Sequence, residues 1–226
     1  MKRNYSRQIR ILHKAAIFQN VPAEEFDDML EALDSQLKYY RSNQILISQG
    51  TKTSRAGVLL EGSLLQYQED FWGRRSEIHE IKEGQLFLES SACARSTVSL
   101  STIQAQTAST VLWFNMNDIM RLDGSRRFHT ILVRNLMHVF AEKNLELNEK
   151  LVHMEKRSTK EKLLSYFSQQ SVEHHSDSFD LDLTRAQLAE YLCVDRAAMS
   201  SELTKLKKDG YLEAERNHIR LLRPVR

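Results

Sequence analysis

The chain has few cysteines, no long apolar run and little net charge, and each of these shortages excludes a class of protein. Its two cysteines, Cys93 and Cys193, lie too far apart for a local zinc site and are too few for an iron–sulfur cluster. No run of about 18 apolar residues occurs, so we expect no membrane-spanning helix. The basic N-terminal stretch lacks a continuous apolar segment and a cleavage site, so we expect no signal peptide. These features predict a cytoplasmic protein with reduced thiols and no membrane partner.

The composition is that of a globular protein with a mildly basic end. Hydrophobic residues make up 41% of the 226 residues and charged residues 27%, and the length allows one large domain or two modest ones. The net charge is +2, and the positive excess lies after residue 155 because the two signs balance before it. That excess is modest for a nucleic-acid binder, for which a basic surface supplies most of the nonspecific affinity.

The most informative segment covers residues 184–212 and has the pattern of two short helices joined by a tight turn. Thr184 with Gln187 forms a capping box, and Asp195 can cap a second helix that Gly210 would end. Apolar residues recur at helical spacing, with a break before the second helix, at Leu183, Leu188, Leu192, Met199, Leu203 and Leu206. Such a helix-turn-helix places its second helix to enter the major groove of DNA.

Residues 37–114 have the pattern of an all-β domain. A short helix is predicted from Pro22 to Ser35, after which the apolar period changes to two. The predicted strands are Leu37–Tyr40, Ile45–Ile47, Val58–Leu60, Leu64–Tyr67, Ser76–Ile81, Leu100–Gln104 and Thr110–Phe114. Glycines fall where these strands must turn or bulge, and positive φ angles are expected at Gly50, Gly57, Gly62, Gly73 and Gly84. Many short strands with regular turns favour a β-sandwich or roll.

A long helix is predicted from Asp118 to about Met154, a range that contains no proline. Its apolar residues form a heptad-like seam at Val133, Leu136, Phe140, Lys143, Leu147, Lys150 and Met154, in which two positions are lysine. A helix of this length is too long for a small β domain to bury. We therefore favour a dimer helix over one that lies on its own domain.

Further elements are predicted around the helix-turn-helix. Ser158 and Glu161 form a capping box that opens a helix from Thr159 to about Gln169. The polar stretch 168–180 is predicted to be a loop, and its His174–His175 pair has no further ligands at suitable spacing, so we expect no metal. Segments Tyr211–Glu213 and His218–Leu222 flank a turn and predict a β-hairpin wing.

This order of elements, together with three segments, resembles the cyclic AMP receptor protein/fumarate–nitrate regulator (Crp/Fnr) family of bacterial transcription regulators. The segments are residues 45–67 with the hairpin glycines Gly50, Gly57 and Gly62, residues 83–90 at the place of the phosphate-cradling loop, and residues 184–212. The resemblance implies an α+β fold with an N-terminal cyclic-nucleotide-binding-like β-roll (1–116), a long dimerisation helix (117–157) and a C-terminal winged helix-turn-helix (158–226). It also implies a homodimer that binds double-stranded DNA under control of the sensor domain, with RNA polymerase as a further partner if the protein activates transcription.

The sensor loop departs from the members of the family that bind cyclic nucleotides. Glu89 matches the family's glutamate, but Leu88 replaces a glycine, and Ser99–Leu100 stand where an Arg–Ser pair clamps the cyclic phosphate. Cyclic AMP is therefore not the expected effector. A pocket for another small molecule would be lined by Glu89, Ser90, Ser91, Thr97 and Ser99, and the alternative is that these are loop residues without a ligand.

Two other signals can be weighed from the residue inventory. Cys93 lies within the sensor loop, where it is either a redox thiol or a small packing residue. We predict no cofactor, and a haem held by one of the eight histidines is the alternative left open.

The predicted recognition helix keeps the family's first DNA-contacting arginine, Arg196, which can bind the O6 and N7 atoms of guanine. Ala197 and Ser201 stand where the family has a polar residue and a second arginine, which weakens or alters that contact. The predicted DNA-binding residues are Thr184, Arg185, Arg196, Ser200, Ser201, Thr204 and Lys205, the first two contacting the DNA backbone. The predicted core residues of this segment are Leu188, Leu192, Cys193 and Leu203.

The sequence thus predicts a dimeric, sequence-specific transcription regulator controlled by an unidentified small molecule or a redox signal. The alternative is a winged-helix module that contacts protein instead of DNA, for which Ser201 in place of arginine is the best argument. An enzyme is not expected, because no Ser/His/Asp spacing, P-loop or paired metal ligands occur. Salt-sensitive binding to duplex DNA separates the first interpretation from the others.

Overall fold

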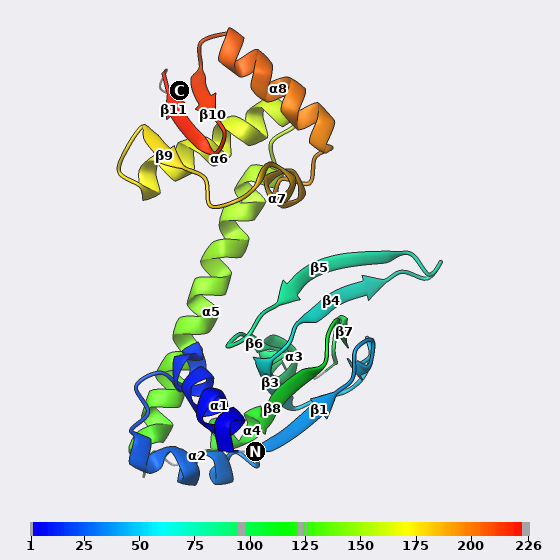
Figure 1. Ribbon diagram of the computed structural model, residues 1–226, viewed down its shortest axis with the longest axis vertical. Helices are drawn as coiled ribbons and strands as arrows, with labels where there is room; N and C mark the ends of the chain where they lie inside the picture. Colours follow the sequence, from blue (N-terminus) through cyan, green and yellow to red (C-terminus); the bar gives the residue numbers. More distant parts are fainter. Residues whose placement is uncertain (1, 95–97, 122–123, 125, 223–226) are drawn as a thin grey trace. The chain divides into compact units, whose positions relative to one another are not determined.

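The computed structural model describes residues 2–94, 98–121, 124 and 126–222 (Figure 1). Its contacts divide the chain into two compact units, residues 1–140 and 141–226, each with its own apolar core. The first unit carries two β-sheets, the second carries a helix-turn-helix with a small sheet, and one long helix contributes residues to both units. The predicted α+β fold with a β-roll, a long helix and a winged helix-turn-helix is confirmed.

The described part of unit 1 contains two four-stranded antiparallel sheets, with strand orders β1-β8-β3-β6 and β2-β7-β4-β5. The strands are β1 (Gln36–Tyr40), β2 (Ile45–Ile47), β3 (Arg55–Glu61), β4 (Leu64–Glu69), β5 (Arg75–Ile81), β6 (Leu86–Phe87), β7 (Thr102–Ala105) and β8 (Ser109–Asn115). Each of the seven predicted strands overlaps one of these. The two-residue β6 was not predicted, because two residues show no period.

Alternate residues of β3 pack into two different cores. Leu59 packs between the two sheets with Trp113 of β8, whereas Val58 and Leu60 pack toward the helices with Leu112. Successive side chains of a strand point to opposite faces of a sheet, and here both faces are covered. This explains why the central strands are continuously apolar instead of alternating.

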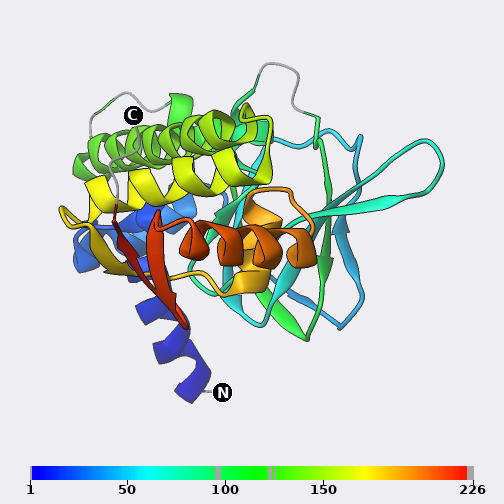
Figure 2. The same cartoon turned by 90° about the horizontal axis from the view of Figure 1, so that it is seen from above.

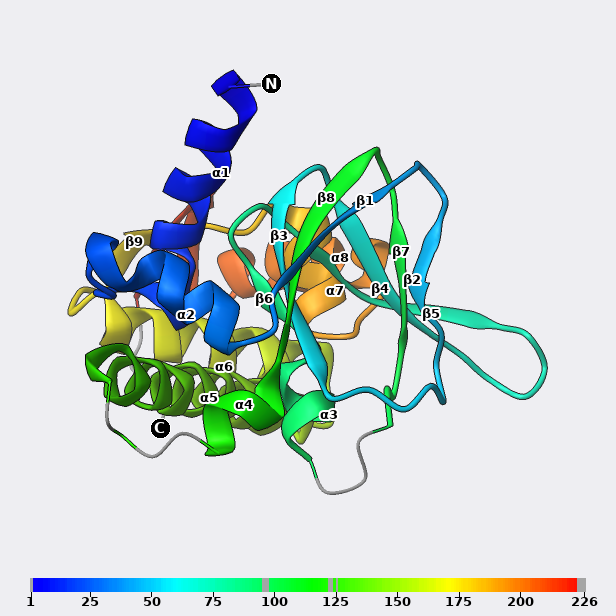
Figure 3. The ribbon, with the colours of Figure 1, turned by 90° about the horizontal axis from the view of Figure 1, so that it is seen from below.

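Helices cover the outer face of the β1-β8-β3-β6 sheet (Figure 3). They are α1 (Lys2–Lys14), the 3₁₀ turns η1 (Ala16–Phe18) and η2 (Ala23–Glu25), α2 (Phe26–Ala32) and α4 (Met116–Arg121), with α3 (Glu89–Cys93) after β6. Helix α2 confirms the helix predicted within residues 22–35. Helix α1 was not predicted. It contributes Leu12 to the same core as Phe26 and Met29.

The long helix α5 (Arg127–Met154) begins later than predicted. The sequence predicted one helix from Asp118, but α4 ends at Arg121 and Gly124 has φ +73°, a left-handed conformation that interrupts a right-handed helix. Asn135 of α5 donates from Nδ2 to the carbonyl oxygens of Ile17 at 3.0 Å and Gln19 at 2.7 Å. These two bonds tie the helix to the N-terminal segment of unit 1.

Gly57 differs from the other glycines of the sheets. Positive φ angles are confirmed at Gly50, Gly62, Gly73 and Gly84, whereas Gly57 is not among the positive-φ residues. A Cβ atom at this position would lie 2.5 Å from Cζ of Phe87. Gly57 is therefore required for space beneath an aromatic ring, and the predicted turn or bulge there is wrong.

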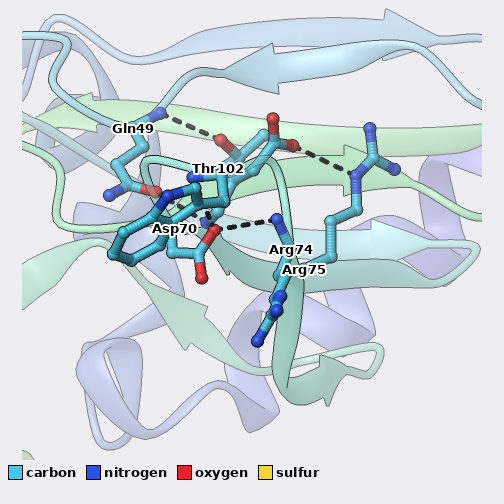
Figure 4. A network of polar contacts seen from close by, with 7 residues as sticks. Gln49, Asp70, Arg74, Arg75 and Thr102 are labelled. Atoms are coloured by element: carbon cyan, nitrogen blue, oxygen red, sulfur yellow. Dashed lines mark hydrogen bonds and ion pairs between the residues drawn. The ribbon is translucent and has the colours of Figure 1, made fainter.

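The β4–β5 hairpin projects beyond the rest of the two sheets and ends in a turn fixed by Asp70 (Figures 2 and 4). The Asp70 Oδ1 atom accepts hydrogen bonds from the backbone N–H groups of Trp72 and Arg74, each at 2.9 Å. This turn presents Trp72 to solvent with 80% of its surface exposed. The other tryptophan, Trp113, is 6% exposed and donates from Nε1 to the hydroxyl of Tyr40 at 2.9 Å.

Unit 2 consists of three helices after α5 and a three-stranded sheet of order β10-β11-β9 among its described residues. The elements are α6 (Thr159–Glu173), β9 (Ser178–Asp180), α7 (Arg185–Tyr191), α8 (Arg196–Lys208), β10 (Leu212–Glu215) and β11 (His218–Leu221). The predicted capping box at Ser158 and the predicted hairpin are confirmed. The segment 168–180 was predicted to be a loop, but α6 extends into it and β9 lies at its end, where Phe179 packs into the core and stacks with His174.

An aromatic cluster lies at the C-terminal end of α5. His153 is 2% exposed, and its ring packs against Tyr166 and Tyr191. Its Nδ1 atom lies 2.8 Å from the Ser165 hydroxyl. Burial lowers the pKa of His153 and raises the pKa of Tyr166 to about 12, because the charged form of each side chain is disfavoured away from water.

Candidate nucleic-acid interface and sensor loop

The first helix of the helix-turn-helix, α7, begins at the predicted capping box. The Thr184 hydroxyl accepts from the backbone N–H of Gln187 at 3.3 Å, and the Gln187 side chain accepts from the backbone N–H of Thr184 at 2.9 Å. After α7 ends at Tyr191, Cys193 has φ +49°, and the Val194 N–H donates to the Ala189 carbonyl at 3.0 Å. This left-handed residue turns the chain toward α8, and it is a position that glycine usually occupies.

Cys193 is exposed, so its predicted core position is wrong. The predicted core positions at Leu188, Leu192 and Leu203 are confirmed. The left-handed turn directs the Cys193 side chain outward, which the helical period of the sequence could not indicate.

The second helix, α8, is capped at both ends as predicted. The Asp195 carboxylate accepts from the backbone N–H of Ala198 at 2.8 Å. At the other end Gly210 has φ +73°, and the N–H of Tyr211 donates to the carbonyl of Leu206 at 3.0 Å. These caps satisfy backbone groups that a free helix leaves without partners, so α8 is fixed in length and direction.

One face of α8 is buried and the opposite face is polar and exposed. Met199, Leu203 and Leu206 pack into the core of unit 2 against α6 and α7. The exposed residues of the helix are Arg196, Ala197, Ala198, Ser200, Ser201, Thr204, Lys205, Lys207 and Lys208. Five of the seven predicted DNA-binding residues therefore lie on one surface of one helix, which Figure 1 shows beside the β10–β11 wing.

Charges on this face are not equally available. No ion pair or hydrogen bond is recorded for the Arg196 guanidinium within the described chain, whereas Lys205 Nζ lies 3.2 Å from Glu202 Oε2. Lys208, which was not among the predicted contacts, is exposed one turn after Thr204 on the same face. The four-residue spacing from Thr204 was the signal that could have identified it.

The two predicted backbone-contacting residues differ in structure. Thr184 is exposed at the start of α7. Arg185 is half-buried, and its Nη2 donates to the carbonyl of Arg216 at 2.7 Å. Arg216 lies in the two-residue turn of the wing with φ +51°. Arg185 therefore holds the wing beside α7, a role that the sequence did not indicate.

The sensor loop begins at Leu88, which has φ +64° and ψ 5°. The backbone thus has the left-handed conformation that a glycine adopts easily, but with a leucine whose side chain is 8% exposed and packs between the two sheets. A non-glycine residue in this conformation costs about 1–2 kcal/mol. The shape of a glycine turn is kept while an apolar side chain fills the space beside it.

The predicted pocket residues of this loop are dispersed. Glu89 is 3% exposed, Ser90 is exposed, and Ser91 is half-buried. Ser90 donates to Glu89 at 3.4 Å, which is long for a hydroxyl bond. Thr97 lies outside the described residues.

Ser99 is fully buried, and its hydroxyl donates to the carbonyl of Ser101 at 2.6 Å. Its backbone pairs with Gly50 and Thr51. The next residue, Leu100, is 69% exposed. Where the family has an Arg–Ser pair, this chain therefore has a serine hydroxyl that is hydrogen-bonded within the protein, followed by an exposed leucine side chain.

Cys93 ends helix α3 and packs against the core of unit 1. Burial raises the pKa of its thiol, and the negative charge of Glu89 raises it further. Because the thiolate is the reactive form, a raised pKa disfavours redox chemistry at neutral pH. The geometry fits the packing interpretation of this residue.

The residues of the predicted seam of α5 differ in their exposure. Leu136 is 5% exposed in the core of unit 1, and Lys150 lies over the ring of Tyr191 at 5.5 Å. The exposed residues Val133, Met137, Asn144, Leu147, Leu151 and Met154 instead form a second seam. The half-buried Phe140, which packs against the core of unit 1, completes its 4,3,4,3,4,3 spacing. Of its apolar members, Met137, Leu147 and Leu151 are 69%, 60% and 58% exposed.

Among the described residues, no helix combines the length and the apolar character that a membrane span requires. Within the same ranges, no group of three or more His, Cys, Asp or Glu side chains is arranged to hold a metal ion.

Sequence comparison matches residues 37–124 to the cyclic nucleotide-binding domain family and residues 161–226 to the Crp-like helix-turn-helix domain family. Together the two matches cover more than half of the chain. No curated protein matches the sequence.

Solved structures with this fold include transcription regulators at low sequence identity. The c-di-GMP-responsive global regulator CLP of Xanthomonas campestris is 13% identical, with a TM-score of 0.53 over 90% of this chain and 100% of that chain. The sensor domain of the transcriptional regulator DNR of Pseudomonas aeruginosa is 16% identical, with a TM-score of 0.53 over 70% and 99%. CprK complexed with OCPA is 14% identical, with a TM-score of 0.58 over 89% and 90%. At these identities the likeness shows a shared fold.

Proposed function

This chain belongs to the cyclic AMP receptor protein/fumarate–nitrate regulator family of transcription regulators, and we propose that it is a dimeric, sequence-specific DNA-binding member that does not respond to cyclic AMP. The observation that carries the proposal is the exposed polar face of α8, which presents Arg196, Ser200, Ser201 and Thr204 from a helix capped at both ends. A helix with this geometry fits the DNA major groove, and base contacts from its N-terminal half specify sequence.

Within this proposal the exposed residues have different roles. Arg196 reads guanine, because its guanidinium, which has no ion pair or hydrogen bond among the described residues, can donate two bonds to O6 and N7. Ser200, Ser201 and Thr204 contact bases or phosphates, Lys205 and Lys208 contact phosphates, and Thr184 contacts the DNA backbone. Arg185 positions the wing through its bond to the Arg216 carbonyl.

The dimer forms along the exposed seam of α5. Two copies of this seam bury Met137, Leu147 and Leu151, which are otherwise exposed, and Asn144 supplies the polar position that fixes register in coiled coils. Replacement of Leu147 by Glu is expected to give a monomer in light scattering, whereas the same change at Leu145, which is 62% exposed outside the seam, leaves a dimer. Equal effects of the two changes would place the interface elsewhere.

The signal is a small molecule other than cyclic AMP. The buried Ser99 hydroxyl and exposed Leu100 provide no clamp for a cyclic phosphate, and Leu88 fills the place of the glycine. The raised pKa of the Cys93 thiol makes the redox alternative the weaker one. Contact with RNA polymerase is part of the proposal only if the regulator activates transcription.

The experiment that tests this function is selection of random duplex DNA by the purified protein at about 150 mM salt, where weak electrostatic binding is largely suppressed. The selection is run with and without a small-molecule extract of the source cells. We expect an enriched palindrome with half-sites about one helical turn apart. No enrichment in either condition would contradict DNA reading and favour the winged helix as a protein-binding module.

A further inference from the structure

A cavity of about 610 Å³ lies in unit 1 between α1, α2 and the β1-β8-β3-β6 sheet. Figure 3 shows α1 and α2 together on one side of this sheet, away from the projecting hairpin. None of the described residues of the sensor loop lines this cavity. Its volume is within the range of small-molecule sites in proteins.

The inner wall of the cavity is apolar. It is formed by side chains of both helices and of three strands, namely Leu12, Phe26, Leu30, Leu37, Leu60 and Leu112. The ring of His13 also lines the cavity and lies 4.3 Å from the Phe26 ring, centroid to centroid. Such a wall binds a ligand through the burial of apolar surface.

Acidic side chains on and around α2 differ in their internal partners, and those that line the cavity are Asp27, Glu31 and Asp34. Asp34 is ion-paired with Arg55, Asp28 pairs with Arg126 at 3.1 Å outside the cavity, and Glu25 accepts from the Phe128 N–H at 3.0 Å. Asp27 and Glu31, which line the cavity, have no ion pair recorded among the described residues. The two carboxylates without a cation thus both line the cavity.

Asp27 and Glu31 are four residues apart on α2 and lie on one face of the helix. Like charges at this spacing repel each other, and a cation between them relieves the repulsion. Both carboxylates are exposed, so a ligand can reach them from solvent. Their position beside an apolar wall favours a ligand that has both a cationic group and an apolar body, because a hydrated metal ion would leave the wall uncovered.

We propose that this cavity binds a small cationic amphiphile, with an ammonium group at Asp27 and Glu31 and an aromatic or aliphatic body against the leucines and Phe26. The ammonium donates to the two carboxylates beside the apolar wall. An anionic ligand of the same shape is repelled by the same carboxylates. The site is independent of DNA binding by α8, so either proposal can fail without the other.

The test uses three probes that share a phenyl ring and a four-carbon chain: 4-phenylbutylamine, 4-phenylbutan-1-ol and 4-phenylbutyrate. Each is titrated against the full-length protein at pH 7 and low salt, with binding followed by ligand-detected NMR. We expect the amine to bind at least about tenfold more tightly than the carboxylate, with the alcohol between them. Raising the salt to about 0.5 M should narrow this difference, because exposed charges are screened.

Variants assign the preference to the cavity. In the double variant Asp27→Asn/Glu31→Gln, the amine should bind no better than the alcohol, while affinity for the alcohol is unchanged. Asp28→Asn is the matched control, because it removes one acidic charge from the same helix at a position that does not line the cavity. Circular dichroism of each variant verifies that the fold is retained.

Three results would overturn the inference. They are equal affinities for the amine and the carboxylate, an order of affinities that survives the double variant, and a loss of preference in Asp28→Asn equal to that in the double variant. The last would show a general effect of the protein's charge and no defined site.

Discussion

The exposed face of α8 and the sensor loop at α3 use their polar side chains in opposite ways. On α8, Arg196, Ser201 and Lys208 extend from a rigid helix into solvent. Around α3, Glu89 and Ser99 are buried, and the Ser99 hydroxyl is bonded within the protein. An exposed polar face therefore requires only one well-capped helix, because its side chains point outward at helical spacing. A ligand pocket depends on how several strands and loops meet, so a polar residue at the right place in the sequence need not face the pocket.

The first prediction concerns Leu88. It asks whether this residue alone prevents the sensor loop from binding a cyclic phosphate. Leu88→Gly removes a buried side chain, at a cost near the 2–5 kcal/mol of Leu→Ala changes, and relieves about 1 kcal/mol of left-handed strain. We expect a net loss of about 1–4 kcal/mol in urea unfolding, and no cyclic AMP binding in calorimetry. Leu100→Gly, at an exposed position, should change stability by less than about 1 kcal/mol. Stoichiometric, micromolar cyclic AMP binding by Leu88→Gly would mean that the glycine was the only missing part.

The next prediction tests the role of the exposed face of α8 in DNA binding. Arg196→Ala should weaken binding to a selected site by roughly 10–100-fold, because it removes a bidentate guanine contact worth about 1–3 kcal/mol, and should change binding to random DNA much less. Lys208→Ala and Lys205→Ala should weaken both kinds of DNA equally and lower the salt slope by about 1. Fluorescence anisotropy on the two DNAs distinguishes these outcomes. Equal losses on both DNAs for Arg196→Ala would remove its assigned role.

A smaller effect concerns the stability of unit 2, on which the α8 face depends. The folded pKa of His153 is lowered by burial, so its contribution to stability is present above the ordinary histidine pKa of about 6.5 and is lost as the pH falls through the lowered value. We expect the free energy of unfolding to decrease below about pH 6.5 by at most about 1.4 kcal/mol per pH unit from this group. His153→Gln should flatten that decrease, whereas His138→Gln, at an exposed position on the same helix, should not. Parallel pH curves for the two variants would show that another group is responsible.

The smallest effect concerns the sensor loop and its thiol. Iodoacetamide at pH 7 should modify the exposed Cys193 several-fold faster than Cys93, whose raised pKa and half-buried position reduce the thiolate available. Peptide mass spectrometry over time gives both rates, and in urea the two rates should converge. Faster modification of Cys93 in the folded protein would restore the redox interpretation of this loop.

The sequence was sufficient wherever structure follows from neighbouring residues. The capping boxes at Thr184 and Ser158, the Asp195 cap and the turn at Gly210 all depend on residues within one helical turn, and all are confirmed. Period-two apolar patterns located the strands for the same reason. The assignment of DNA contacts to Arg196 and its neighbours, and the domain limits at 116 and 157, stay predictions.

Features that depend on distant contacts were not predictable. Leu136 fits a heptad seam in the sequence, but its burial is decided by the core of unit 1. Gly57 has the position of a turn glycine, but it is required by the ring of Phe87, thirty residues later in the chain. Likewise, Arg185 was predicted to contact the DNA backbone, but its Nη2 atom donates to the wing carbonyl of Arg216 at 2.7 Å. In each case the deciding partner comes from another element, which no local pattern contains.

The environments of the two tryptophans make unit 1 optically distinct from unit 2. Both Trp72 and Trp113 belong to unit 1, the first in solvent at the hairpin tip and the second inside the sandwich. Tryptophan fluorescence therefore reports on unit 1 alone. Trp72 should emit at longer wavelength and be quenched readily by iodide, whereas Trp113 should emit at shorter wavelength and be protected from iodide. Replacing Trp72 with Phe leaves a single emitter within the sheets. Loss of structure in unit 1 can then be followed in the intact protein, while helical circular dichroism records both units.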